Sequence, residues 1–187
     1  MIKTIYYYRH GETYYSSKNM LYGDKEYEAL LTEKGRSQAV LLGAELARRP
    51  KFDLHMVSPL PRAVQTATIV QTHLQTELLV EPSLIEGIKE KREDTWARVE
   101  KLAERLVKLP EQTILLGTHG FICCCLAAYF RGQTVKNMSL ENLPTAGFGW
   151  IELEDGQAKR GCRSVSTHLN PNATPVPEVI HELVGIK

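Results

Sequence analysis

The 187-residue sequence lacks the features of a membrane protein or of a nucleic-acid-binding protein. No apolar run approaches the roughly 18–20 residues that a helix needs to cross a bilayer. Basic and acidic residues nearly cancel, with 23 Lys and Arg against 22 Asp and Glu, so the formal net charge is only +1. Broad electrostatic attraction to nucleic acid or to an anionic membrane is therefore not expected. Any bound anion has to be held by a local cluster of side chains.

The chain also lacks a disulfide framework. Three of its four cysteines, Cys123–Cys125, are consecutive within an apolar stretch. Consecutive residues of a helix point in different directions, so these thiols cannot converge on one metal ion as spaced zinc ligands do. We interpret them as small buried hydrophobic residues, a common environment for free cysteine. Together with the expected absence of a signal peptide, this pattern favours a reducing, cytoplasmic location.

What the sequence does contain is an alternation of strand and helix patterns. Strands are predicted at 3–9, 53–57, 113–117, 147–153 and 159–168, and helices at 32–49, 61–76, 94–109 and 121–130. The segment 170–177 is predicted to be irregular because of its Asn and Pro residues, and the last ten residues are predicted to form a short helix. The alternation favours an α/β three-layer sandwich in one domain spanning residues 1–187, with a largely parallel central sheet between helices on both faces.

Two of the predicted strands end in the same way. His10 closes the apolar run 5–8 and His119 closes the run 113–116, each followed by a glycine. Ligands of open α/β sheets bind just beyond the carboxyl ends of the strands. The glycine after His10 permits a sharp turn or an unusual backbone angle, so that Arg9 and His10 can face one crevice. An arginine and two histidines suit a phosphate. The alternative is that each histidine simply ends a strand.

Arg62 is a third candidate for the same crevice. Ser58 follows the predicted strand 53–57, and Arg62 lies in the first turn of the next predicted helix. A cation at that end of a helix opposes the helix dipole, and a bound anion would offset the conflict. The alternative is that Arg62 is a solvated surface residue.

Glu86 closes another short apolar run and is a candidate general acid. Burial or neighbouring anions can raise the pKa of a carboxyl group enough to keep it protonated for this role. Glu12, Glu90 and Glu93 are rivals for the role, and spacing alone does not choose among them. The alternative is that Glu86 is a solvated loop residue.

Taken together, these residues resemble the histidine phosphatase superfamily, also called phosphoglycerate mutase-like, from residue 3 to about residue 153. Any one of the matching blocks is a weak indication, but all of them occur in the order and spacing of the family. The blocks are 9–13 (RHGET), 31–39 (LTEKGRSQA), 58–67 (SPLPRAVQTA) and 118–120 (THG).

The resemblance implies a role for each candidate. His10 is the nucleophile that accepts the phosphoryl group. Arg9, Arg62 and His119 hold the phosphate oxygens and stabilise charge in the transition state. Glu86 occupies the position of the acid that protonates the leaving oxygen and later activates water. The resemblance implies no metal and no other cofactor.

The sequence departs from the family pattern at the phosphate contacts. Thr13 matches the motif and is expected to bind the phosphate. Many members carry an asparagine three positions later, where this chain has Ser16, which is shorter. We predict both Thr13 and Ser16 as phosphate-binding residues.

The second departure is a short segment between Glu86 and His119. It has room for a loop near 87–93 and one helix, without the helical cap of larger members. We therefore expect an open, shallow site, similar to that of the compact branch that includes protein phosphohistidine phosphatases. Members of that branch often lack a clear acid at the position of Glu86.

We therefore expect a metal-independent phosphatase that works through phospho-His10. Its substrate is expected to be a phosphorylated small molecule or a phosphoprotein. The alternatives are a phosphoglycerate-type mutase and a catalytically weak module that binds a phosphorylated ligand. No nucleic-acid or membrane partner is expected, and the sequence does not indicate an oligomeric state.

Overall fold

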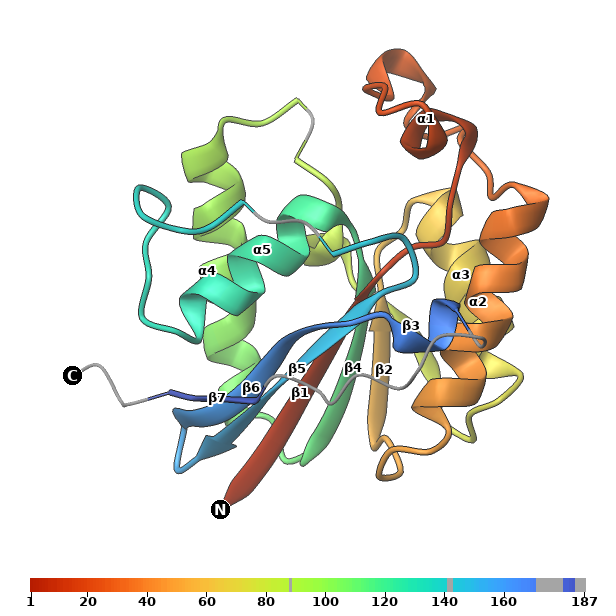
Figure 1. The fold of residues 1–187 in the computed structure, drawn as a ribbon. Coiled ribbons are helices and arrows are strands. Elements are labelled where there is room, and N and C mark those ends of the chain that lie inside the picture. Colours follow the sequence, from red (N-terminus) through yellow and green to blue (C-terminus); the bar gives the residue numbers. More distant parts are fainter. Residues whose placement is uncertain (88, 141–142, 171–179, 184–187) are drawn as a thin grey trace.

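The computed structural model describes residues 1–87, 89–140, 143–170 and 180–183. In this part of the chain a seven-stranded sheet has the order β3-β2-β4-β1-β5-β6-β7 (Figure 1). The strands β3, β2, β4 and β1 run parallel, whereas β5, β6 and β7 are antiparallel additions, so the predicted largely parallel sheet is confirmed. The strands are β1 (Ile2–Arg9), β2 (Leu54–Val57), β3 (Leu78–Val80), β4 (Thr113–Thr118), β5 (Phe148–Glu154), β6 (Gln157–Val165) and β7 (Ile180–Glu182).

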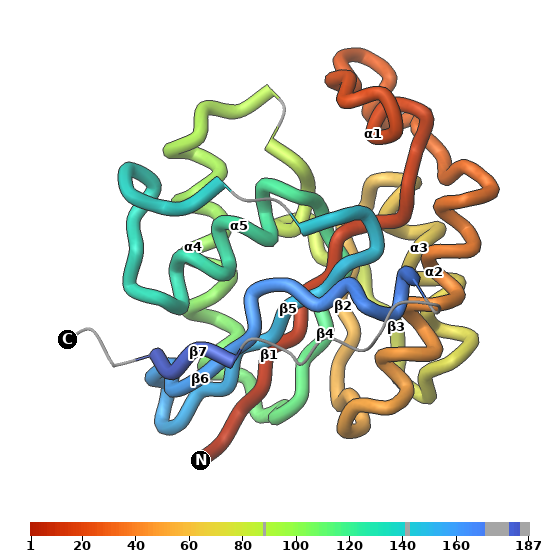
Figure 2. The backbone as a smooth tube through the Cα atoms, viewed as in Figure 1, coloured from red at the N-terminus to blue at the C-terminus, as the bar shows by residue number. Residues whose placement is uncertain are grey.

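Helices cover both faces of the sheet, as predicted for a three-layer sandwich (Figure 1, Figure 2). One face carries α2 (Glu33–Leu46) and α3 (Pro61–Gln71), and the other carries α4 (Arg92–Lys108) and α5 (Gly120–Tyr129). A short helix α1 (Tyr14–Ser17) and three 3₁₀ turns lie in the connections, the turns at Gly23–Lys25, Pro82–Leu84 and Thr167–Leu169.

Alternate side chains of β1 fill the two halves of the core. Tyr6 and Tyr8 pack in the cluster that includes α2 and α3, whereas Ile5 and Tyr7 pack in the cluster that includes α4 and α5. This is the period of two expected for a strand. In β4, residues 114–116 are fully buried, as expected for a strand covered on both faces. The two-sided burial fixes the register of β1 and β4, and hence where their carboxyl ends lie.

Two helices are shorter than predicted. Thr32 caps α2, since its Oγ accepts a hydrogen bond from the Gly35 N–H at 3.0 Å, but α2 ends at Leu46 rather than at residue 49. The helix α3 ends at Gln71 rather than at 76, because the chain turns there to enter β3. The strand β3 was not predicted, since its three residues are too few to show an alternation.

The predicted C-terminal helix is wrong for the residues that the structure describes there. Ile180–Glu182 form β7, which pairs with β6. The edge of β6 offers unpaired backbone groups to a passing segment, and these favour a strand over a short helix. The strand β6 itself ends at Val165, before the predicted end at 168. The predicted irregular segment 170–177 lies outside the described residues except for its first residue.

The loop after β1 crosses the first turn of α2 at very short backbone distance. A Cβ on Gly11 would lie 2.4 Å from the carbonyl oxygen of Gly35, and a Cβ on Gly35 would lie 2.0 Å from the carbonyl oxygen of Glu12. Gly11 has no positive φ, so the expectation of an unusual backbone angle is wrong. Glycine is required here for close approach, and the crossing fixes the loop that carries His10 against α2.

We expect Gly35→Ala to destabilise the protein by about 1–3 kcal/mol, because the added methyl group would enter the backbone at Glu12. Ser37→Ala is the matched control, because Ser37 is exposed in the same helix and its replacement leaves the crossing untouched. Urea unfolding measures both free energies. Equal stability of G35A and the wild type would contradict the crossing.

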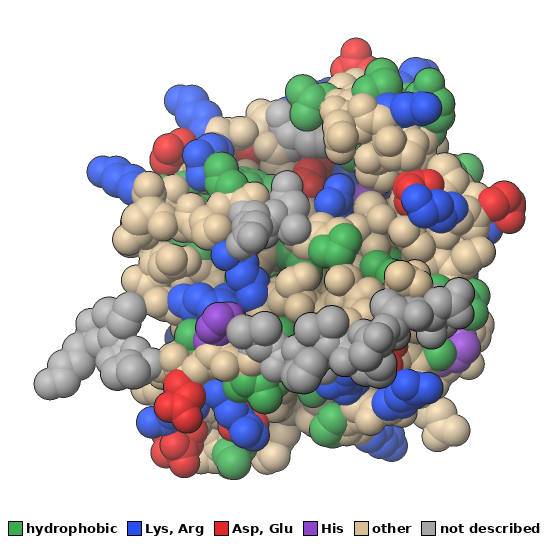
Figure 3. Space-filling view, in the orientation of Figure 1, with side chains coloured by type: hydrophobic (Ala, Val, Ile, Leu, Met, Phe, Trp, Pro, Cys, Tyr) green, Lys and Arg blue, Asp and Glu red, His purple; other side chains and the backbone are tan. Residues whose placement is uncertain are grey.

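The cysteines are buried and the surface charges are mixed, as the sequence predicts. All four cysteines are buried and none forms a disulfide, and burial raises the pKa of each thiol in Cys123–Cys125. Within the described ranges, no helix combines the length and the apolar character needed to cross a membrane. On the face shown in Figure 3, Lys and Arg side chains are interspersed with Asp and Glu.

Candidate active site

The carboxyl ends of β1, β4 and β2 lie side by side and bring the candidate residues together. The backbone N–H of His10 donates to the Thr118 carbonyl at 2.9 Å, and that of Ser58 donates to the Gly117 carbonyl at 2.9 Å. These bonds extend the parallel ladders beyond the strand ends. The ring centroids of His10 and His119 are consequently only 5.3 Å apart. The two histidines share one site, and do more than end their strands.

His10 is neutral and has a defined tautomer. Its Nδ1 lies 2.8 Å from the carbonyl oxygen of Gly11, which can only accept, so Nδ1 carries the proton and donates it. Nε2 is then the nitrogen with the lone pair. Burial, followed by the charges of Arg62 and Arg9, lowers the pKa of His10 to about 3. A neutral ring with a free lone pair is the form that a nucleophile needs.

The ring of His119 is oriented by a serine. Ser58 Oγ lies 2.7 Å from His119 Nε2, and the Leu60 N–H donates to the same oxygen at 3.4 Å. We assign the hydroxyl proton to the bond with Nε2, which places the ring proton on Nδ1. Burial, then the neighbouring His10 ring and the charges of Arg62 and Arg9, lowers the pKa of His119, so the ring is a neutral donor. Its Nδ1 has no hydrogen-bond partner among the described residues and lies 4.0 Å from Glu86 Oε2.

We expect Ser58→Ala to release His119 from this tautomer, because Nε2 would lose its donor. The kcat/KM for a phosphate ester should fall by about tenfold, and Ser58→Thr should restore most of it because it keeps the hydroxyl. NMR of the ring nitrogens reports the tautomer directly. Ser37→Ala, at an exposed serine of α2, is the control. Unchanged His119 nitrogen shifts in S58A would contradict the assignment.

Arg62 is completely buried, so the alternative of a solvated surface arginine is wrong. Its Nη1 donates to the carbonyl oxygen of Glu26 at 2.9 Å, and its Cζ lies 4.0 Å from the centroid of the Tyr22 ring. Nη2 lies 3.7 Å from Glu26 Oε1, at the distance of an ion pair. Neither Nε nor Nη2 has a hydrogen-bond partner among the described residues. Two N–H directions of a buried cation are therefore left for an anion.

Arg9 completes the cationic side of the site. Its Nη1 donates to the Leu143 carbonyl at 2.9 Å, and its buried Nε has no partner in the described part of the chain. The charges of Arg9 and Arg62 both lower the pKa values of His10 and His119, so the two guanidinium groups act on both rings. The site thus gathers two permanent cations and several unpaired N–H donors around a neutral nucleophile, which suits a phosphate.

Glu86 lies at this site and is not a solvated loop residue. Its side chain is 16% exposed, and Oε2 is 4.0 Å from His119 Nδ1. Burial raises the pKa of Glu86 to about 7, against the opposing effect of the Arg62 and Arg9 charges. A carboxyl group with this pKa is partly protonated near neutral pH, as a general acid must be.

The three rival carboxylates are occupied elsewhere or exposed. Glu12 accepts a hydrogen bond from Lys34, and Glu90 accepts one from Arg98. Glu93 is exposed in the first turn of α4. Of the four predicted candidates, Glu86 is the one that lies beside a site histidine.

Thr13 and Ser16 are engaged in a local structure. Thr13 is the N-cap of α1: its Oγ accepts from the Ser16 N–H at 3.1 Å, and Ser16 Oγ accepts from the Thr13 N–H at 2.8 Å. The Thr13 hydroxyl also bonds the Tyr22 hydroxyl at 2.8 Å. This capping box gives both hydroxyl groups partners inside the protein. Their contact with a phosphate stays a prediction.

Several site residues were missed in the sequence. Ser58 was visible at the end of a predicted strand and within a matching block, but its partner could not be read from the pattern. Tyr22 and Glu26 lie in an irregular segment between α1 and α2, where no periodicity places a side chain. Glu26 is only 4% exposed, and burial raises its pKa. Thr66 is a further residue of the site that the sequence did not reveal, and its Oγ accepts a hydrogen bond from the Gly11 N–H at 3.0 Å.

Three of the site residues are buried, whereas the expectation of an open, shallow site stays a prediction. His10, Arg62 and His119 each expose 1% or less of their surface.

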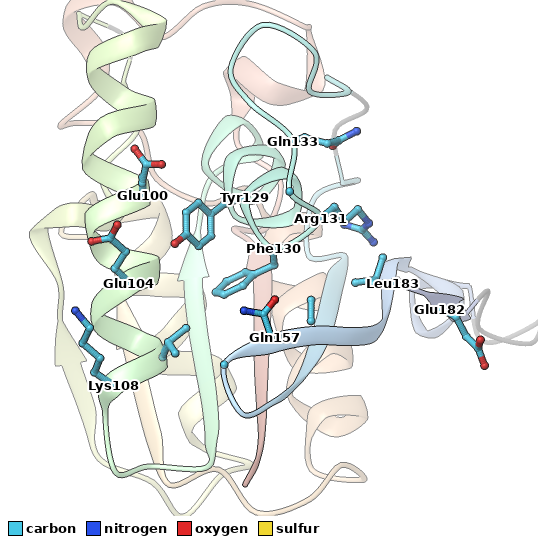
Figure 4. Close-up of a pocket in the computed structure, with 14 residues that line it drawn as sticks. Glu100, Glu104, Lys108, Tyr129, Phe130, Arg131, Gln133, Gln157, Glu182 and Leu183 are labelled. Atoms are coloured by element: carbon cyan, nitrogen blue, oxygen red, sulfur yellow. The ribbon is translucent and has the colours of Figure 1, made fainter. Parts of the chain in front are cut away.

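A separate cavity of about 660 Å³ opens between α4, the end of α5 and the β5–β6 hairpin (Figure 4), and none of the site residues lines it. Among the described residues, no group of three or more His, Cys, Asp or Glu side chains could hold a metal ion.

Comparison with known proteins agrees with this fold. The family description "histidine phosphatase superfamily (branch 1)" matches residues 5–88 and 85–161. No curated protein sequence matches the chain. The alpha-ribazole phosphatase of Shigella flexneri has a similar structure, with a TM-score of 0.73 and 23% identity over 83% of this chain and 93% of that one.

Two further solved structures are similar. A mycobacterial glucosyl-3-phosphoglycerate phosphatase in complex with VO3 has a TM-score of 0.68 and 22% identity, over 80% of this chain and 90% of that one. Bacillus stearothermophilus YhfR has a TM-score of 0.70 and 23% identity, over 83% and 94%. The fold is thus a phosphoglycerate mutase-like α/β sandwich. The chain belongs to the histidine phosphatase superfamily, branch 1.

Proposed function

We propose that this protein is a metal-independent phosphatase that hydrolyses a phosphate ester through a phosphohistidine on His10. The observation that carries the proposal is the state of His10, a neutral ring whose Nδ1–H is held by the Gly11 carbonyl and whose Nε2 keeps its lone pair. Binding alone does not require such a nitrogen among the cations Arg9 and Arg62. The arrangement therefore favours covalent catalysis over a module that only binds a phosphorylated ligand.

In the first step, the lone pair of His10 Nε2 forms a bond to phosphorus, and the bond from phosphorus to the leaving oxygen breaks. That oxygen takes the proton of the Glu86 carboxyl group. In the second step, water attacks phosphorus, gives a proton to the Glu86 carboxylate, and the P–N bond breaks. Phosphate leaves, and His10 and Glu86 return to their starting protonation states.

N–H donors that have no hydrogen-bond partner among the described residues stabilise the charge on the phosphoryl oxygens in both steps. Nε of Arg9, Nε and Nη2 of Arg62, and Nδ1–H of His119 supply N–H groups that need no reorganisation when the substrate binds. Phosphoryl transfer depends mainly on positioning and on charge stabilisation of this kind. Each donor can therefore contribute to the rate without any chemical change of its own.

We propose a phosphorylated small molecule as the substrate, ahead of a phosphoprotein. The names of two structural neighbours, an alpha-ribazole phosphatase and a glucosyl-3-phosphoglycerate phosphatase, point to small phosphorylated substrates. The buried cysteines, none of which forms a disulfide, support a reducing, cytoplasmic location.

Trapping the intermediate tests this function. A ³²P-labelled aryl phosphate is mixed with the protein and quenched within milliseconds in alkaline denaturant, in which a phosphohistidine survives. We expect label on the protein, located on His10 by peptide mass spectrometry. Turnover without label would contradict the covalent mechanism, and binding without turnover would favour the binding module. Transfer to an added alcohol in preference to water would favour a mutase.

A further inference from the structure

We infer that Tyr22 is a positioning residue that holds the Arg62 guanidinium group in the orientation needed for phosphate binding. The inference rests on the proposed function, because it takes Arg62 as a phosphate ligand. Tyr22 lies outside the four sequence blocks that resemble the family, so its role comes from the structure alone.

The guanidinium group of Arg62 is held on two sides. The Tyr22 ring covers one face, with Arg62 Cζ 4.0 Å from the ring centroid. On the edge, Nη1 donates to the Glu26 carbonyl at 2.9 Å, and Nη2 lies 3.7 Å from Glu26 Oε1. A planar cation that is stacked on its face and bonded at one corner has a fixed plane. Nε and Nη2, which have no hydrogen-bond partner among the described residues, then point in a fixed direction.

Arg62 needs such support because its environment opposes a charge. The residue is fully buried in the first turn of α3, where the helix dipole is unfavourable to a cation. Burial lowers the pKa of Arg62. Attraction between a desolvated guanidinium group and an aromatic face is stronger than at an exposed site, so the Tyr22 ring offsets part of this cost.

Tyr22 is itself fixed to the loop that carries the nucleophile. Its hydroxyl group bonds Thr13 Oγ at 2.8 Å, and its ring centroid is 6.4 Å from that of His10. Tyr15 packs on it as well, at 5.1 Å between ring centroids. The ring thus connects the His10 loop with Arg62, two halves of the site that come from different parts of the chain.

The contribution of the Tyr22–Arg62 contact to phosphate binding can be measured separately from its effect on stability. Tyr22 is only half-buried, so its truncation leaves no large cavity in the core. Tyr22→Leu removes the aromatic face and the hydroxyl, whereas Tyr22→Phe removes the hydroxyl alone. Tyr27→Leu is the matched control, because Tyr27 is 62% exposed on the same segment.

The experiment measures the binding of inorganic phosphate by calorimetry in the wild type, Y22F, Y22L and Y27L. We expect Y22L to bind phosphate about tenfold more weakly, and Y22F and Y27L to stay within about twofold of the wild type. All variants should melt within a few degrees of one another. In an Arg62→Ala background, adding Y22L should cause no further loss, because Tyr22 acts through Arg62.

Three results would overturn the inference. They are wild-type phosphate affinity in Y22L, a loss in Y22F as large as in Y22L, and full additivity of Y22L with R62A. The assay needs no turnover, so its outcome is independent of whether a phosphohistidine forms. A wild-type protein that binds no phosphate would overturn the phosphate site itself, whereas a Y22L variant with unchanged affinity would overturn only the role of Tyr22.

Discussion

His10→Ala should lower kcat/KM for an aryl phosphate by about four orders of magnitude or more, because it removes the nucleophilic nitrogen itself. Phosphate binding should change by only a few fold, since the donors of Arg9, Arg62 and His119 remain in place. Steady-state kinetics and calorimetry with inorganic phosphate separate the two effects. A large loss of turnover with retained binding is the pattern of a residue that acts in the chemical step.

His73→Ala is the control for this variant. His73 is exposed, lies just after α3 and lines a hollow with residues 46, 47 and 49–52, none of which belongs to the site. Its turnover should match that of the wild type. Because His10 is buried, thermal melting must show that H10A still folds. Turnover of folded H10A within tenfold of the wild type would place the nucleophile on another residue.

Glu86→Gln should slow esters with poor leaving groups by about 10²- to 10⁴-fold, because an alkoxide must be protonated as it leaves. An aryl phosphate with an acidic phenol needs no proton, so its first step should slow much less. The measurement is kcat/KM of E86Q and of the wild type for an alkyl and for a nitrophenyl phosphate, and the loss should be much larger for the alkyl ester. Glu93→Gln, at an exposed carboxyl group of α4, is the control. Equal loss on both substrates would move the acid role away from Glu86.

We also expect Glu86→Gln to change how kcat/KM depends on pH. Burial raises the pKa of Glu86 to about 7, so the carboxyl group is protonated below this pH and ionised above it. For the alkyl ester, wild-type kcat/KM should therefore fall as the pH rises past about 7. The groups that act on Glu86 are Arg62, Arg9, Glu26 and Arg98. The phosphate group of the substrate also ionises, with a pKa of about 6, but this affects both proteins equally and cancels in the comparison. If kcat/KM of E86Q fell in the same way above about pH 7, the titrating group would be a residue other than Glu86.

The local patterns of the sequence determined the elements that carry most of the site. The apolar runs before His10 and His119 identify strand ends, and Thr32 and Pro61 mark helix starts, because these features depend on neighbours within a few residues. Parallel pairing of adjacent strands then brings their carboxyl ends together. The near-zero net charge likewise restricted anion binding to a local cluster.

Elements that depend on remote partners could not be predicted in this way. The strand β7 forms because the edge of β6 is available to it, and β3 has too few residues to show a pattern. Gly11 is required for the crossing with Gly35, more than 20 residues away, and not for its own backbone angle. Neither partner is visible in the sequence around the residue concerned.

The sequence by itself determined which residue types stand at the strand ends, His10 and His119, and in the first turn of α3, Arg62. Only the tertiary structure decided their chemical state. The His119 tautomer depends on Ser58, 61 positions away, and the plane of Arg62 depends on Tyr22 and Glu26. Protonation and orientation are set by burial and by hydrogen-bond partners, which a chain acquires only when distant segments pack together.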